Sequence, residues 1–167
     1  MAKNIIWAVV FALCAAILQS TLLSRLAICH AVPDLALGII VYSAYVNGTM
    51  TGQISGFFSG LLLDFLSANP LLGLNTLIRT LVGALAGLMK GTFFLDFFFL
   101  PMILCAAATI IKALALFLLH LLFAGAVPAY SLTEPLFWVE LGLNTGSAPF
   151  LFGLLKLFPS LLAGRRD

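Results

Sequence analysis

The sequence predicts an all-α integral membrane protein with about six transmembrane helices, two of them short. Of the 167 residues, 63% are apolar and only 8% are charged, whereas a soluble domain carries about 25% charged residues. The apolar residues form long runs, and they do not alternate with polar residues as in the strands of a transmembrane barrel. This composition excludes a soluble enzyme, a secreted disulfide scaffold and a disordered linker. Because the runs occupy nearly the whole chain, we expect a single transmembrane domain over residues 1–167.

Proline, glycine and asparagine mark the breaks between the helices. Pro33 and Asp34 suit the start of a helix, since proline lacks an N–H and a carboxylate favours the positive end of the helix dipole. Asn47-Gly48-Thr49 is a turn signal. The second and third runs fall short of the ~20 residues that span a bilayer, so they borrow flanking residues, sit in a thin bilayer or form a re-entrant hairpin. The expected helices cover residues 5–23, 33–46, 52–66, 73–89, 98–123 and 135–157.

The placement of lysine and arginine predicts the orientation, because cytoplasmic loops carry an excess of these residues. With six spans and a cytoplasmic N-terminus, Arg25 alone lies on the outer side. The inner side then holds Lys3, Lys90, Lys156, Arg165 and Arg166. We therefore expect both termini in the cytoplasm. The net charge of +2 is too small to indicate nucleic-acid binding.

Glycines recur at four-residue spacing in two successive expected helices. The third helix carries Gly52, Gly56 and Gly60, and the fourth carries Gly83 and Gly87, with Gly91 four residues further on. Small residues at this spacing form a flat stripe on one helix face, against which another helix can pack closely. These stripes either pack the helices of this chain against each other or receive the helix of a partner protein.

A second group of residues is polar and lies at membrane depth, where ionisable side chains are costly and face the protein interior or each other. We expect Asp64 to form an ion pair with Arg79 or to share a polar neighbour with it. Glu140 is expected to pair with Lys112 or His120. The predicted intramembrane polar network comprises Gln19, Asp64, Asn75, Arg79, Glu140 and Asn144.

This polar network has three interpretations: an internal ion-pair network, a ligand pocket that opens outward, or a docking surface for another membrane protein. Catalysis has no support, since the chain has no serine-nucleophile elbow, phosphate-binding loop or zinc-protease motif. His120 has no Cys, Asp or Glu three or four residues away, so a metal site is not indicated. We therefore expect neither enzymatic activity nor a cofactor.

Several motifs together resemble a known family. They are Pro33-Asp34-Leu35, the stretch Gly56-Phe57-Phe58-Ser59-Gly60-Leu61-Leu62-Leu63-Asp64, and Gly73-Leu74. These residues resemble the rod shape-determining protein MreD family of bacteria, whose hallmark is a Gly-Phe-x-x-Gly-Leu-x-x-Asp stretch after a short helix begun by proline. The residues that carry the resemblance most directly are Pro33, Asp34, Phe57, Asp64 and Gly73.

The resemblance implies a small multi-pass protein of the bacterial cytoplasmic membrane that works in the cell-elongation machinery. Its implied partners are MreC above all, then the MreB filament, the glycosyltransferase RodA and a class B penicillin-binding transpeptidase, besides membrane lipid. It also implies a fold similar to the S-components of energy-coupling-factor transporters. A substrate-binding subunit of a vitamin-type transporter is therefore the alternative function.

Overall fold

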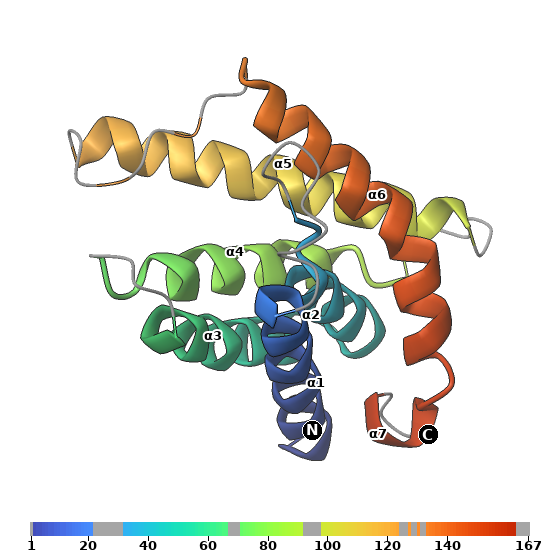
Figure 1. Cartoon of the computed structure of the whole chain (residues 1–167). Helices are drawn as coiled ribbons and strands as arrows, with labels where there is room; N and C mark the ends of the chain where they lie inside the picture. The colour runs from blue at the N-terminus through green and yellow to red at the C-terminus, as the bar shows by residue number, and fades with distance from the viewer. Residues whose placement is uncertain are drawn as a thin grey trace.

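The structure is a computed structural model that describes residues 2–21, 32–66, 71–91, 98–123, 127, 130 and 133–162. All regular structure within these residues is helical (Figure 1). The helices are α1 (Ala2–Thr21), α2 (Leu35–Asn47), α3 (Thr49–Leu66), α4 (Leu74–Leu88), α5 (Phe99–Leu122), α6 (Pro135–Leu155) and α7 (Pro159–Leu162). The first six match the expected segments to within three residues at each end. The short α7 was not expected from the sequence.

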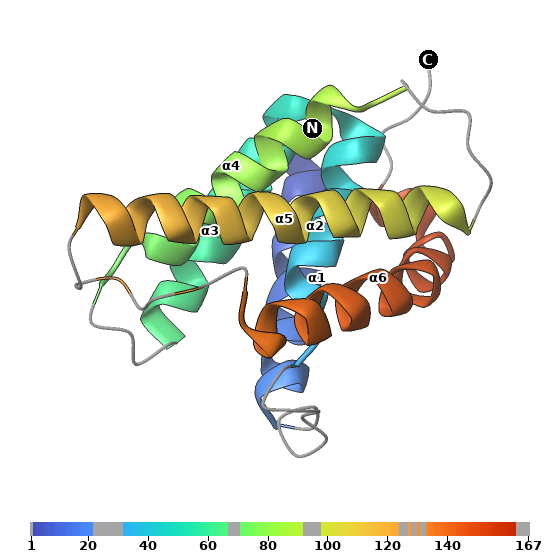
Figure 2. The ribbon, with the colours of Figure 1, turned by 90° about the horizontal axis from the view of Figure 1, so that it is seen from above.

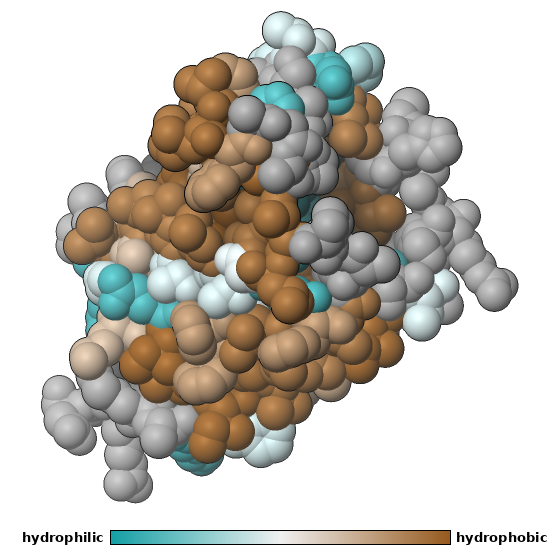
Figure 3. Space-filling model, turned by 90° about the vertical axis from the view of Figure 1, so that its left-hand side faces the viewer, coloured by the Kyte–Doolittle hydropathy of each residue, from teal (hydrophilic) through white to brown (hydrophobic). Residues whose placement is uncertain are grey.

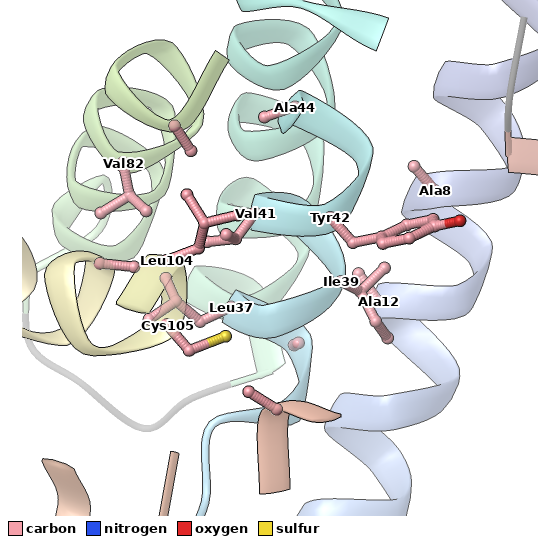
Figure 4. Close-up of a cluster of buried hydrophobic side chains, with 14 of the residues drawn as sticks. Ala8, Ala12, Leu37, Ile39, Val41, Tyr42, Ala44, Val82, Leu104 and Cys105 are labelled. Carbon is pink, nitrogen blue, oxygen red and sulfur yellow. The ribbon is translucent and has the colours of Figure 1, made fainter. Parts of the chain in front are cut away.

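Helix α2 is the centre of the molecule. Its nine consecutive residues from Ala36 to Ala44 are all buried, which is the pattern of a helix surrounded by other elements. In Figure 4, Val41 and Leu37 lie on the side of α4 and α5, whereas Tyr42 and Ile39 point toward α1. At 1.5 Å per residue, its 13 residues reach only about 20 Å, so the second expected span is a short helix buried inside the protein.

A single residue, Gly48, separates α2 from α3. Its φ of +100° lies in the left-handed region, where a residue without a Cβ has no steric penalty. Its N–H donates to the carbonyl of Ala44 at 2.7 Å and so closes the last turn of α2. The turn predicted at Asn47-Gly48-Thr49 is therefore confirmed, and α2 and α3 form a helical hairpin.

The glycine stripes of α3 and α4 face each other. A Cβ built on Gly52 would lie 2.2 Å from the carbonyl oxygen of Gly83, and one on Gly56 would lie 2.3 Å from that of Arg79. The same holds for Gly60, 2.5 Å from the Cα of Thr76, and for Gly87, 2.4 Å from the Cα of Thr49. Gly91 does not belong to the second stripe, because it follows the end of α4 and nothing lies within 4 Å of a Cβ built on it. The other glycines of both stripes are covered inside the chain, at a separation that no side chain fits.

The remaining helices cross rather than run in parallel. Helix α5 runs crosswise to the direction of α1 (Figure 1), and it passes across α1 in the view from above (Figure 2). Among the described helices, α5 alone is both long and apolar enough to cross a membrane, while three shorter apolar stretches occur in α1, α2 and α4. Helix α7 packs against α1. It is also tied to the end of α2, where the Asn47 side chain donates to the carbonyl of Leu162 at 2.6 Å, and Leu162 is fully buried.

The outer surface is strongly apolar. Large side chains such as Phe65, Leu72, Leu121 and Phe150 are each 70% or more exposed. Figure 3 shows a mainly hydrophobic face that is crossed by a narrow hydrophilic band. Soluble monomers rarely expose apolar patches of this extent, so the surface suits contact with lipid.

Candidate functional site

Asp34 lies at the centre of a buried charge cluster. As the N-cap of α2, its Oδ1 accepts a hydrogen bond from the N–H of Leu37 at 3.0 Å. Its two carboxylate oxygens lie 2.9 and 3.2 Å from Nη2 of Arg79 on α4. Nζ of Lys112, on α5, lies 3.3 Å from Oδ2. One carboxylate therefore faces two cations and also begins a helix.

Glu140 on α6 extends this cluster. Its Oε1 lies 2.5 Å from Nζ of Lys112, and its Oε2 accepts a hydrogen bond from the phenol of Tyr130. Burial and then the Glu140 carboxylate raise the pKa of Tyr130, so this phenol stays protonated and donates. Of the two partners expected for Glu140, Lys112 or His120, the structure shows Lys112. The ring Nδ1 of His120 lies instead 2.8 Å from the carbonyl oxygen of Val127.

The charges of the four charged side chains in this cluster sum to zero. Asp34, Arg79 and Glu140 are at most 10% exposed at their side chains, and Lys112 is 21% exposed. Two carboxylates and two cations share three ion pairs, on α4, α5, α6 and at the start of α2. Removing one partner of such a buried pair costs about 3–5 kcal/mol, because the other charge is left uncompensated. The cluster therefore fixes the positions of four helices relative to each other.

Asp64 takes no part in this cluster, and the predicted ion pair between Asp64 and Arg79 is wrong. Its carboxylate accepts hydrogen bonds from the backbone N–H groups of Gly73, Asn75 and Thr76 at 2.9–3.0 Å. The side chains of Asn75 and Thr76 donate to it as well. The start of a helix presents unpaired N–H groups and a positive dipole end. These groups satisfy the carboxylate without a cation, and Arg79 pairs with Asp34.

Gly73 makes this arrangement possible. It is the N-cap of α4 with a φ of +98°, and it has no side chain with which to cap the helix. Asp64 supplies the missing acceptor from the end of α3. The two motif residues Asp64 and Gly73 thus act together to join α3 to α4.

Asn144 connects the charge cluster to α5 and α6. Its Oδ1 accepts the backbone N–H of Asp34 at 2.6 Å, and its Nδ2 donates to the hydroxyl of Thr109 at 3.0 Å. Gln19 lies on α1, where its side chain lines a cavity beside Arg79 and Lys112. Phe57 is not part of the site, since it is 44% exposed and contacts the ring of Phe58.

Pro33 directly precedes the N-cap and lies outside α2, which begins at Leu35. The helix therefore starts two residues later than the sequence predicts, because the Asp34 side chain takes the capping role. The sequence pattern indicates a helix-starting role and a family-motif position for Asp34, but it does not place this residue in the polar network. Its position beside a proline, at the edge of an apolar run, gave no sign of its cations on α4 and α5.

Two adjoining cavities border the cluster. The larger has a volume of about 530 Å³ and the smaller about 180 Å³. They share the lining residues Asp34, Asn75, Arg79 and Lys112. Within the described part of the chain, no group of three or more His, Cys, Asp or Glu residues could hold a metal ion.

Comparison with known proteins identifies a family. The family model described as rod shape-determining protein MreD matches residues 1–158. No curated protein and no solved structure gives a match. Because the family match covers almost the whole chain, including the charge cluster and both glycine stripes, the chain belongs to the MreD family of rod shape-determining membrane proteins.

Proposed function

We propose that this protein is a non-enzymatic component of the bacterial elongation machinery that binds MreC and helps to organise peptidoglycan synthesis at the membrane. The observation that carries the proposal is the family match over residues 1–158. In this role the chain, as a single transmembrane domain, works with MreC directly. It works with MreB, RodA and a class B penicillin-binding transpeptidase as members of a larger complex.

The geometry of the charge cluster supports a scaffold. Asp34, Arg79, Lys112 and Glu140 are paired with each other, so their main effect is to hold helices in place. The covered glycine stripes add a close contact between α3 and α4. A rigid set of helices with an apolar outer surface can present a fixed face to a single-span partner.

We also propose a multi-pass inner-membrane topology with both termini in the cytoplasm. The basic-residue count supports it, although Arg25, Arg165 and Arg166 lie outside the described residues. The packing of α7 near α1 supports termini on one side of the membrane. A reporter fused after Asp167 that is active only in the periplasm would contradict this topology.

The test of MreC binding is co-purification in mild detergent. A tagged copy of this chain is expressed with MreC from the same cells, and the complex is isolated through the tag. We expect MreC to elute with the chain at a fixed stoichiometry. A monodisperse chain that elutes without MreC contradicts the proposal.

The alternative function is a substrate-binding subunit of a vitamin-type transporter, with a fold similar to an S-component. The cavity of about 530 Å³ beside Arg79 and Lys112 favours it, because ligand pockets have volumes of roughly 300–1,000 Å³. The same purification distinguishes the two functions. Co-isolation of an ATPase module and a bound vitamin, in place of MreC, supports the transporter.

A further inference from the structure

One nitrogen of the Arg79 guanidinium has no hydrogen-bond partner among the residues that the structure describes. The side chain is 5% exposed, and its Nη2 donates to Asp34. Nη1 is buried, and no described group accepts a hydrogen bond from it. Buried polar groups are nearly always hydrogen-bonded, and a guanidinium is shaped to donate two parallel bonds to a carboxylate or a phosphate. The unused nitrogen therefore points to an acceptor that comes from outside the chain.

Arg79 lines the cavity of about 530 Å³, which is large enough for more than a single bound water. The cavity has a polar end and an apolar wall. The polar end contains Gln19, Asp34, Asn75, Arg79 and Lys112. The apolar wall contains Ala16, Ile17, Val32, Leu63 and Leu66.

The apolar wall reaches the outer surface of the protein. Ile17 on α1 is 47% exposed and Leu66 on α3 is 65% exposed, although both line the cavity. The outer surface around them is apolar and suits lipid. An amphipathic molecule in the bilayer can therefore approach the cavity sideways, with its polar group toward Arg79.

The described lining of the cavity holds more cations than carboxylates. Among these residues, Arg79 and Lys112 are cations and Asp34 is a carboxylate. Glu140, which balances Lys112, is not among them. A phosphate would bring the acceptor oxygens that Nη1 lacks.

We propose that this cavity binds the phosphate group of an anionic phospholipid, with Arg79 as the principal donor. The acyl chains lie along Ile17 and Leu66 and continue into the bilayer. This lipid site is independent of whether the protein binds MreC.

The experiment is native mass spectrometry of the detergent-purified chain. Dioleoylphosphatidylglycerol is titrated against dioleoylglycerol, which has the same acyl chains but no phosphate. We expect one phosphatidylglycerol to remain bound to the wild-type chain and no dioleoylglycerol. Equal retention of both lipids contradicts the proposal, because the phosphate then plays no part.

Two variants locate the site. Arg79→Gln removes the donor, and we expect the bound fraction to fall by about tenfold, a size typical of a lost charge-assisted hydrogen bond. Ala16→Phe fills the cavity from α1 and leaves every charge in place. It therefore tests whether the lipid occupies the cavity even if Arg79→Gln does not fold. Val10→Phe is the matched control, because Val10 lies on the same helix, is 43% exposed and does not line the cavity.

Lipid retention by the two α1 variants, and displacement of the lipid by free phosphate, distinguish the possible outcomes. Loss of lipid from Ala16→Phe with retention by Val10→Phe supports the site. A folded Ala16→Phe chain that keeps its lipid overturns it. In a final competition, sodium phosphate is added at millimolar concentration to the lipid-bound wild-type chain. If phosphate alone displaces the lipid from the wild-type chain, the ligand is a free phosphate and the lipid assignment is wrong.

Discussion

Asp34 and Arg79 join the start of α2 to α4 through a contact of 2.9 Å between Oδ1 and Nη2, although they are 45 positions apart in the sequence. The same carboxylate caps α2. A change at Asp34 therefore affects both the helix that it begins and the charge that it neutralises. This double role gives a physical reason for the Pro33-Asp34 pair at this point of the chain.

Replacing Asp34 with alanine should destabilise the protein strongly. Arg79 and Lys112 lose their shared carboxylate, and orphaned buried charges typically cost about 3–5 kcal/mol. The measurement is thermal unfolding in detergent, followed by gel filtration of the heated sample. Glu134→Ala is the control, because Glu134 is an exposed carboxylate that makes no capping bond. Equal unfolding temperatures for the two variants would count against the buried pairing.

Leucine at Gly56 should prevent normal folding. The new Cβ would lie 2.3 Å from the carbonyl oxygen of Arg79, so α3 and α4 must separate. Leucine at Gly142 is the matched control, because nothing lies within 4 Å of a Cβ built there. We expect a monodisperse profile for Gly142→Leu and aggregation or loss of yield for Gly56→Leu. A stable Gly56→Leu chain would mean that the two helices do not approach this closely.

Loss of the Asp64 carboxylate should loosen the start of α4. Asp64→Ala leaves the N–H groups of Gly73, Asn75 and Thr76 without their acceptor. Thr76→Val removes only one hydroxyl bond to the carboxylate, worth about 1.5–3 kcal/mol for a charged acceptor. Amide hydrogen exchange should therefore speed up in the first turn of α4 in Asp64→Ala, and much less in Thr76→Val. Similar exchange in both variants would argue against Asp64 as the cap.

Tyr130 makes the stability of the folded protein depend on pH in the alkaline range. Burial and the Glu140 carboxylate raise the pKa of this phenol in the folded state. The stabilisation by this phenol is therefore complete below the ordinary tyrosine pKa of about 10. It is lost as the pH rises through the pKa of the phenol in the folded state. We expect Tyr130→Phe to unfold at a lower temperature at pH 7 and to lose less stability than the wild type between pH 9 and 11. If the unfolding temperatures of the two proteins fall in parallel as the pH rises, Tyr130 does not cause this pH dependence.

The helices could be predicted from the sequence because their ends carry local signals. Gly48 fixes the break between α2 and α3, and Gly73 fixes the start of α4. The facing glycine stripes were also predictable as one of two interpretations, since four-residue spacing determines a helix face. The small number of intramembrane charges narrowed the partner of Glu140 to Lys112 or His120, and the structure shows Lys112.

The partner of Arg79 could not be predicted in the same way. Asp64 lies nearer to Arg79 in the sequence, on the preceding helix, so the sequence favours it as the counter-ion. The N–H groups of Gly73 and Thr76 satisfy Asp64 instead, and backbone groups are not visible in a count of charges. The position of Asp34 depends on how α2 inserts among α1, α4 and α5, which is a matter of three-dimensional packing.

Two double-mutant cycles, measured by unfolding of the purified chain, test most directly whether Asp34 or Asp64 is the counter-charge of Arg79. The first combines Asp34→Asn with Arg79→Gln, and the second combines Asp64→Asn with Arg79→Gln. Contacting residues show an interaction energy of about 0.5–3 kcal/mol, whereas independent sites add within roughly 0.3–0.5 kcal/mol. We predict a clear interaction energy in the first cycle and additivity in the second. Additivity for Asp34 together with coupling for Asp64 would contradict the account.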